Sequence, residues 1–417
     1  MKVLLVTLYF PPAGGGGVQR PLKFATHLPE LGIETHVLAP EDPKWIHRDE
    51  GLPPPTLAWV HRVKFLGPQG RKPAEELHGT TGLERYTRQA SLFGRRLLLP
   101  DENVTYNLTA VPAAIRIARE EGIDVVITTS PPPSIHFLGA AVKGATGARW
   151  IADLRDSVVA HPHRDAQKLA VRIKEHGTQA VASLVARNAD AIVTVSDAIA
   201  EEMRTRSPRG QVVTIANGSD FEDFHGLEYR RGDRFRITHA GSFFGKRDPR
   251  PFLTALARVD GVTARFVGDF RAADREWASA IMDRIELIPY APHRKALELQ
   301  RGSEALLLLI PEADGRGRGV LSGKVFEYLA AERPILAVVP PDGAAAQLIR
   351  DTGGGVVVAP DDIDGMEREL AAMRDVWRSG GLDGSPLSDD WRDRLDRRTR
   401  VQELAELIHS LAEEHVE

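Results

Sequence analysis

One stretch in the second half of the chain combines a predicted helix start with side chains that suit a nucleotide. The sequence "SGKVFEYLAAERP" predicts a helix that begins near Ser322 and ends before Pro334. Ser322 is a candidate N-cap residue. Gly323 lacks the β-carbon that would keep a ligand away from the first backbone amides. This position therefore suits an anion, because helix N-termini carry free N–H groups and a partial positive charge.

Lys324 and Glu327 lie in the first two turns of this predicted helix. Lys324 is either a solvated surface charge or a point charge that faces phosphate. Glu327 either complements the helix dipole, a surface effect of about 0.3–1 kcal/mol, or accepts hydrogen bonds from both hydroxyls of a ribose. Together these residue types favour binding of a nucleotide.

A second charged motif, "HAGSFFGKRDPRPFLTAL", carries Lys246 and Arg247 between a predicted strand and a predicted helix. The carboxyl ends of strands in such sheets are where ligands bind. Exposed surface charge is the alternative interpretation. A charge-assisted hydrogen bond to phosphate contributes about 1.5–3 kcal/mol, so a basic pair here could hold a diphosphate.

Four glycines, Gly14–Gly17, follow the first predicted strand and precede the first predicted helix. Glycine lets a phosphate or a sugar ring approach the backbone. The run does not match the dinucleotide-binding or P-loop patterns. A flexible surface turn is the alternative, but the position after the first strand favours a ligand-binding loop.

Short apolar runs alternate with helical segments along the chain, and the pattern restarts near residue 236. Strands are predicted at 2–8, 34–38, 125–129, 149–154, 191–195 and 211–215, then at 236–239, 263–267, 286–289, 305–310, 334–339 and 355–358. Helices are predicted at 18–31, 107–121, 134–146, 166–188 and 197–205, then at 251–259, 274–282, 293–300, 323–331 and 344–352. This alternation indicates parallel sheets covered on both faces. We predict an α/β fold with two facing Rossmann-like, doubly wound domains and a ligand in the interdomain cleft.

The polar, glycine-containing stretch 217–235 is the best candidate for a linker. We therefore place an N-terminal domain at 1–220, a linker at 221–235 and a C-terminal domain at 236–390. A C-terminal helix at 391–417 is expected to pack back on the N-terminal domain. The proline-rich stretch 41–59 is predicted to be an irregular loop.

Composition limits the function classes. The chain has 417 residues, 54 basic and 58 acidic, for a net charge of −4, and it has no cysteine. The charge disfavours a nucleic-acid-binding polycation, and the lack of cysteine excludes disulfides and thiolate chemistry. The sequence shows no secretion signal and no membrane-spanning run, so we expect a cytoplasmic protein.

Taken together, seven stretches resemble the retaining nucleotide-sugar glycosyltransferases of family 4, which have the GT-B fold. They occur in family order over nearly the whole chain and read "YFPPAGGGGVQRPLKFATHL", "IADLRDSV", "IVTVSDAIAEEM", "IANGSDFEDF", "HAGSFFGKRDPRPFLTAL", "RFVGDF" and "GKVFEYLAAERPILAVVP". The resemblance implies transfer of a sugar from a nucleotide diphosphate donor, UDP- or GDP-linked, with net retention and with neither a bound metal nor another cofactor.

The resemblance also assigns roles by position. The donor-binding positions are Gly16, Gly17, Lys246, Arg247, Ser322, Gly323, Lys324 and Glu327. Among them, Glu327 is expected to bind the ribose and Arg247 the diphosphate. Asp153 and His136 are the predicted catalytic residues, which position the sugar or the acceptor. The alternatives are a cap or an ion pair with Arg155 for Asp153, and an ordinary helix-face role for His136.

The sequence departs from the family pattern at Gly319, where many members have a glutamate. Glu312 or Asp314 in the same loop is the candidate substitute. Two other functions stay open: a non-hydrolysing sugar-nucleotide epimerase, and a nucleotide-sugar-binding protein without turnover. The expected acceptor is a polysaccharide or lipid-linked saccharide, with a small natural product second. Residues 91–107 are either a contact with a membrane-bound lipid acceptor or a packed loop.

Overall fold

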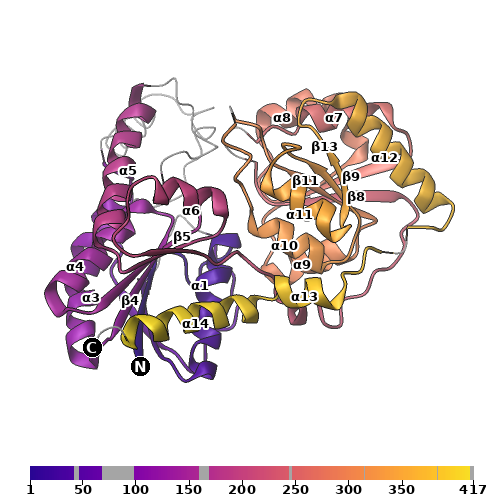
Figure 1. Cartoon of the computed structure of the whole chain (residues 1–417). Helices are drawn as coiled ribbons and strands as arrows, with labels where there is room; N and C mark the ends of the chain where they lie inside the picture. The colour runs from indigo at the N-terminus through magenta and orange to yellow at the C-terminus, as the bar shows by residue number, and fades with distance from the viewer. Residues whose placement is uncertain are drawn as a thin grey trace. The chain divides into compact units, whose positions relative to one another are not determined.

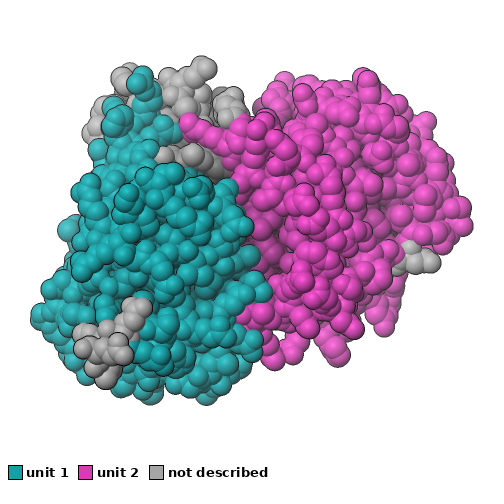
Figure 2. All heavy atoms as spheres, in the orientation of Figure 1, with its two compact units in different colours: residues 1–161, 165–216, 400–417 teal, residues 162–164, 217–399 magenta. Residues whose placement is uncertain are grey.

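The computed structural model describes residues 1–41, 47–67, 98–158, 169–243, 247–313, 315–382 and 384–413, and its strands form two parallel sheets (Figure 1). These sheets belong to two compact units (Figure 2). Unit 1 comprises the described residues of Met1–Ala216 and those from Arg400 onward. Unit 2 comprises the described residues of Asn217–Thr399.

The sheet of unit 1 has seven strands in the order β3-β2-β1-β4-β5-β6-β7. Their bounds are β1 Lys2–Thr7, β2 Glu34–Pro40, β3 Trp59–Val63, β4 Val125–Ser130, β5 Arg149–Leu154, β6 Ala191–Thr194 and β7 Gln211–Thr214. The helices are α1 Gly16–His27, α3 Asn107–Glu121, α4 His136–Thr146, α5 Leu169–Asn188, α6 Asp197–Arg204 and α14 Arg397–Glu413. Short 3-10 turns occupy Pro29–Leu31, Val104–Tyr106 and Pro133–Ile135.

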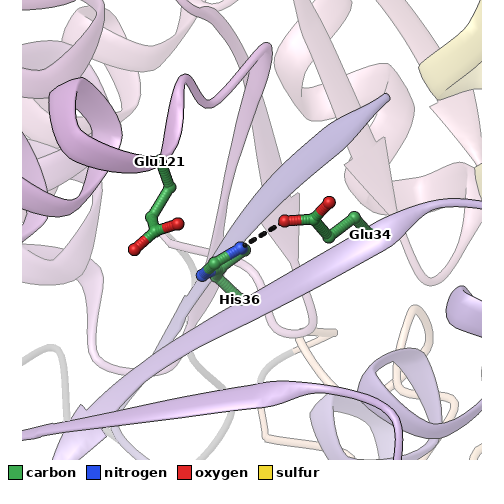
Figure 3. Close-up of side chains that lie close together, drawn as sticks. All are labelled: Glu34, His36 and Glu121. Atoms are coloured by element: carbon green, nitrogen blue, oxygen red, sulfur yellow. Dashed lines mark hydrogen bonds and ion pairs between the residues drawn. The ribbon is translucent and has the colours of Figure 1, made fainter.

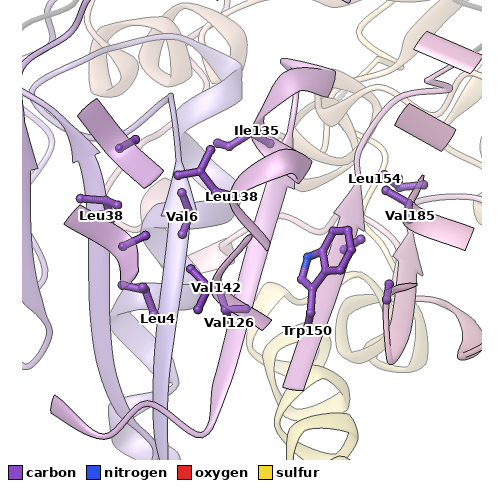
Figure 4. Close-up of a cluster of buried hydrophobic side chains, with 14 of the residues drawn as sticks. Leu4, Val6, Leu38, Val126, Ile135, Leu138, Val142, Trp150, Leu154 and Val185 are labelled. Atoms are coloured by element: carbon purple, nitrogen blue, oxygen red, sulfur yellow. The ribbon is translucent and has the colours of Figure 1, made fainter. Parts of the chain in front are cut away.

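Both faces of this sheet are covered. Alternate residues of each strand point to opposite faces, and both sets of side chains lie in hydrophobic clusters. Leu4 and Val6 of β1 join a core cluster with helices α3, α4, α5 and α6 (Figure 4). Val3 and Leu5 join a second cluster with α1 and with α14, which contributes Leu404 among others. The result is the near-continuous apolar strand typical of parallel sheets.

Unit 2 repeats this plan with a six-stranded sheet in the order β10-β9-β8-β11-β12-β13. Its strands are β8 Phe235–Ala240, β9 Val262–Val267, β10 Ile285–Ile288, β11 Ala305–Leu309, β12 Ile335–Val338 and β13 Gly355–Val358. Its helices are α7 Arg250–Arg258, α8 Ala272–Trp277, α9 His293–Arg301, α10 Gly323–Ala330, α11 Ala344–Thr352, α12 Ile363–Arg378 and α13 Asp389–Leu395, with 3-10 turns at Phe221–Phe224 and Ser279–Arg284. Helices α7 and α12 pack on one core cluster of this sheet.

The prediction of two doubly wound α/β domains is confirmed, with three local differences. Strand β3 was not predicted, because the proline-rich stretch before it masks the signal of a short edge strand. The predicted helix at 274–282 is instead α8 followed by a 3-10 turn with a kink at Ile281. Helix α1 begins at Gly16, two residues before its predicted start.

Among the residues that the structure describes, we find no helix with both the length and the apolar character needed to cross a bilayer. Residues 68–97 lie outside the described residues, and they include residues 91–97 of the predicted membrane-contact or packed segment at 91–107.

Candidate functional site

Helix α10 begins with its first amides uncovered. Ser322 occupies the N-cap position with extended backbone angles, φ −70° and ψ 151°, but its side chain makes no capping hydrogen bond to the described residues. The predicted side-chain cap is therefore wrong, although the position is right. At Gly323 a β-carbon would meet open space, since no heavy atom lies within 4 Å. Val325 N–H donates to the Ser322 carbonyl at 3.1 Å, so the first-turn amides that can meet an acceptor from outside the helix are those of Gly323 and Lys324.

Lys324 belongs to α10, and its ammonium group lies beside the carboxyl end of β8. The backbone of Gly241, just after this strand, has φ +137°, and a β-carbon there would lie 2.1 Å from the Lys324 Nζ atom. Any larger residue would therefore displace the ammonium group. The same helix and strand are joined by the Tyr328 hydroxyl, which accepts a hydrogen bond of 2.8 Å from the Ala240 N–H. The parallel sheet thus brings the two predicted motifs together, as the strand order requires.

Arg247 is the second cation of this site. Its side chain is buried, and its Nη1 donates to the Ser242 carbonyl at 3.2 Å. Lys246, the other predicted diphosphate residue, lies outside the described residues. Within the described ranges, no carboxylate lies at ion-pair distance from the Lys324 ammonium. The pair therefore concentrates positive charge beside the N-terminus of α10.

The surroundings of Lys324 disfavour its charged form. Burial and the nearby charge of Arg247 lower the pKa of Lys324 well below its usual value, and Glu327 opposes that effect only in part. Burial also lowers the pKa of Arg247. Two like charges in a poorly solvated place are unfavourable unless an anion joins them. The site is thus built for an anionic ligand.

Glu327 is held from helix α9. Its carboxylate accepts a hydrogen bond of 3.3 Å from Gln300 Nε2, and its Oε1 lies 3.5 Å from His293 Nε2. Burial would raise the pKa of Glu327, but the hydrogen bonds and the charges of His293 and Arg397 lower it. Burial lowers the pKa of His293, yet Glu327 raises it overall. A fixed, ionised carboxylate with 18% of its side chain exposed can accept hydrogen bonds from a diol.

Sequence reasoning missed His293 and Gln300 as site residues. Both lie in a predicted helix and are separated by two turns, so they share one helix face. That spacing was the available signal, since it places both side chains opposite the same neighbouring element. Their contacts with Glu327 show that α9 positions the carboxylate.

The glycine loop of unit 1 leads directly into α1. Gly15 is the N-cap with φ +94°, a conformation that favours glycine, and β-carbons at Gly15 and Gly16 would meet nothing within 4 Å. Gly14 N–H donates to the His47 carbonyl at 2.6 Å, and the Gly17 carbonyl accepts from Arg155. The loop is anchored at both ends, while its two central glycines are exposed.

Asp153 forms a buried ion pair with Arg20 rather than with Arg155. Arg20 Nη2 donates to Asp153 Oδ1 at 2.8 Å, and Thr129 Oγ1 donates to Oδ2 at 2.7 Å. The same guanidinium donates to the carbonyls of Ile215 and Ala216, both at 3.0 Å. Because Asp153 is fully buried, it connects β5 to α1 and the end of β7. Its predicted catalytic role stays a prediction.

His136 is also fully buried. Its Nδ1 lies 2.9 Å from Thr128 Oγ1, which in turn accepts a hydrogen bond of 2.8 Å from the Trp150 indole. Burial lowers the pKa of His136 to about 3, although the charge of Asp153 acts in the opposite direction. The imidazole is therefore neutral at pH 7. The predicted contact of His136 with a sugar requires neighbouring atoms to move first.

The loop that carries Gly319 contains a separate ion-pair network. Arg318 Nε lies 3.4 Å from Glu312 Oε1 and 3.3 Å from Asp342 Oδ2, and these side chains are exposed. Glu312 is thus engaged by Arg318, and Asp314 lies outside the described residues. The substitution of either residue for the missing family glutamate stays a prediction.

Two doubly wound parallel sheets, of seven and six strands, make up a fold of the GT-B type. Residues 15–218 match the family model described as "Glycosyl transferase 4-like domain", and this part of the chain belongs to that family. The match places this part of the chain among glycosyl transferase 4-like domains. No curated protein matches the sequence.

Solved structures share the fold at low sequence identity. A sucrose-phosphate synthase from Thermosynechococcus elongatus has a TM-score of 0.67 at 15% identity and covers 98% of each chain. Anabaena HepE in complex with UDP-glucose has a TM-score of 0.62 at 15% identity, over 98% of this chain and 100% of HepE. A putative UDP-N-acetylglucosamine 2-epimerase from Listeria monocytogenes has a TM-score of 0.54 at 14% identity, over 99% and 97%.

Proposed function

We propose that the chain is a retaining, metal-independent hexosyltransferase that uses a UDP- or GDP-sugar. The observation that carries this proposal is the site at the start of α10, where two cations adjoin uncovered amides and a fixed carboxylate stands in the second turn. The diphosphate binds Lys324, Arg247 and the first amides of α10, and Glu327 accepts the ribose hydroxyls. The UDP and UDP-glucose complexes of HepE support the choice of a uridine donor.

The chemistry breaks the bond between the anomeric carbon and the diphosphate oxygen. Negative charge grows on the leaving diphosphate, and Lys324, Arg247 and the helix dipole stabilise it more strongly as it grows. We propose front-face attack by the acceptor hydroxyl, with the leaving phosphate oxygen taking the acceptor's proton, which retains the anomeric configuration. Protein cations supply the charge neutralisation, so the step needs no divalent metal ion. The glycine loop, Gly16 and Gly17, is the proposed backbone contact from unit 1.

The proposed acceptor is a growing polysaccharide or a lipid-linked saccharide of the cell envelope, with a natural-product glycoside as the alternative. A lipid-linked acceptor would place the enzyme in the cytoplasm at the inner face of the membrane. These finer assignments follow from the family resemblance and from the predicted apolar and basic segment at 91–107.

A nucleotide panel tests the donor site. We expect UDP or GDP to raise the thermal midpoint of the wild-type protein more than ADP or dTDP. The variant Glu327→Ala should lose most of the shift, because the ribose contact is gone. Glu298→Ala is the matched control, since Glu298 is exposed on α9 and pairs with Lys295. An unchanged ligand-induced shift in folded Glu327→Ala protein would contradict the ribose assignment.

The structural likeness to the Listeria epimerase makes epimerisation the second candidate. The two reactions differ in their need for an acceptor. Incubation of the enzyme with a nucleotide sugar alone, followed by NMR of the sugar protons, separates them. A new epimer without any acceptor would favour the epimerase, whereas transfer or slow donor hydrolysis would favour the glycosyltransferase.

A further inference from the structure

A compact group of metal-ligand residues lies in unit 1 away from the glycine loop. Figure 3 shows Glu34 and His36 on β2 with Glu121 at the end of α3, and one ligand atom of each lies within 4.8 Å of the others. Glu34 begins β2, whereas the glycine loop follows the carboxyl end of β1. Because β1 and β2 are parallel, the group and the loop lie at opposite edges of the sheet.

We propose that Glu34, His36 and Glu121 form a binding site for a divalent transition-metal ion of the zinc type. One imidazole nitrogen and two carboxylate oxygens are a ligand set that zinc accepts, with water in the remaining position. Imidazole favours such borderline ions over magnesium and calcium, which prefer all-oxygen sites. This proposal is independent of the donor site, and the ion would take no part in sugar transfer.

His36 is already oriented as a ligand. Its side chain is buried, its Nε2 lies 3.0 Å from Glu34 Oε1, and its Nδ1 lies 3.0 Å from His61 Nε2. The two imidazole rings stack with centroids 5.3 Å apart. When His36 Nδ1–H donates to His61, the Nε2 lone pair faces the two carboxylates. An outer partner of this kind typically fixes the tautomer and orientation of a metal-bound histidine.

Lys2 competes with the ion for Glu34. Its Nζ lies 3.0 Å from Glu34 Oε1, and its side chain is 38% exposed. A long lysine side chain can move its ammonium group into solvent while its stem stays in place. The ion would therefore replace one positive charge near Glu34 with two. It would also join β2 to the end of α3, and hence stabilise unit 1.

Metal binding can be measured directly on the full-length, tag-free protein after treatment with a chelator. Calorimetry with Zn²⁺ should show one saturable site, Zn²⁺ should raise the thermal midpoint, and Mg²⁺ at the same concentration should not. Co²⁺ should give visible absorption of a low-symmetry, four- or five-coordinate ion. The variant Glu121→Gln should weaken Zn²⁺ binding at least about tenfold, the loss typical even for outer partners of a ligand.

Two further variants make the test specific. Glu120→Gln is the matched control, because Glu120 is the neighbour of Glu121 and pairs with Arg116 at 3.0 Å, so its Zn²⁺ affinity should change less than about twofold. Lys2→Gln should tighten Zn²⁺ binding, since it removes the competing cation and leaves all three ligands in place. Absence of saturable Zn²⁺ binding to the wild type, or equal affinities in wild type and Glu121→Gln, would overturn the proposal. Lys2→Gln keeps the proposal testable if Glu121→Gln fails to fold, because unchanged binding in Lys2→Gln would also count against it.

Discussion

The two units differ in how their poorly solvated charges are paired: unit 1 pairs opposite charges, and unit 2 brings like charges together. In unit 1, Asp153 and Arg20 form a pair whose acceptors and donors are met by Thr129 and two backbone carbonyls. In unit 2, Lys324 and Arg247 bring like charges together, and the pKa of Lys324 falls well below its usual value because of burial and Arg247. The pair in unit 1 is complete without a ligand, whereas no carboxylate among the described residues of unit 2 lies at ion-pair distance from the Lys324 ammonium, so a bound anion would add a favourable partner for Lys324.

This contrast separates residues that hold the fold from residues that await a substrate. Removing one member of a satisfied buried pair leaves an uncompensated charge, so stability falls. Removing one member of a like-charge pair relieves repulsion, so stability holds or rises while binding falls. Stability traded against function in this way is typical of binding sites.

The largest expected effect is the loss of unfolding free energy in the variant Arg20→Met. This variant leaves Asp153 charged and buried without its partner, which typically costs about 3–5 kcal/mol. We expect unit 1 to lose that amount of unfolding free energy. Hydrogen exchange of the β4 and β5 amides measures it, because the two units need not unfold together.

The control for this prediction is Arg116→Met, which removes an exposed pair with Glu120, both side chains being more than half exposed. Its cost should stay below about 1 kcal/mol. The double variant Arg20→Met with Asp153→Leu should recover stability relative to Arg20→Met alone, because no buried charge remains. Equal costs for Arg20→Met and Arg116→Met would show that the buried pair does not support unit 1.

The second largest expected effect is weaker nucleotide binding by the variant Lys324→Met. Loss of a charge-assisted hydrogen bond to phosphate, about 1.5–3 kcal/mol, should weaken binding of the donor nucleotide roughly 10–100-fold. The unfolding free energy of unit 2 without ligand should stay equal or rise, because one of two repelling charges is gone. Calorimetry with UDP or GDP, whichever binds, and urea unfolding measure the two quantities.

Lys295→Met provides the comparison, since Lys295 is exposed on α9 and pairs with Glu298 at 2.9 Å. It should change neither quantity appreciably. A Lys324→Met protein that is less stable yet binds nucleotide as tightly as the wild type would assign Lys324 to the fold instead of the donor site.

Most of the fold could be predicted from sequence because local sequence patterns indicate most of its strands and helices. Apolar β-branched runs such as Val125–Ser130 and helix periods such as Asn107–Glu121 need no distant partner to be recognised. Strand β3, Trp59–Val63, was missed for the same reason: its short, partly exposed pattern is weak, and its pairing with β2 is tertiary. The parallel order of strands was enough to bring Lys324 beside Gly241.

The partners of the site residues could not be predicted in the same way. Asp153 suggested Arg155 as its partner because the two are close in sequence, but the true partner, Arg20, is 133 positions away. Arg155 lies just beyond β5, which ends at Leu154, and its guanidinium donates to the carbonyls of Ser130 and Gly17 instead. The spacing of His293 and Gln300 indicates a shared helix face, but which element that face meets depends on the packing of α9 beside α10, so His293 was missed.

The smallest expected effect distinguishes a helix start that is capped from one that is left open. Asp362 caps α12, since its Oδ1 accepts a hydrogen bond of 2.8 Å from Gly365 N–H, whereas the Ser322 side chain makes no such bond to the described residues at α10. Asp362→Ala should therefore cost about 1 kcal/mol, and Ser322→Ala only a few tenths. Urea unfolding of unit 2 compares them. Because the proposed phosphate contacts of this turn come from backbone amides, Ser322→Ala should also keep its nucleotide affinity. A loss of affinity without a loss of stability would mean that the hydroxyl itself binds the donor, and a cost equal to that of Asp362→Ala would mean that α10 is capped after all.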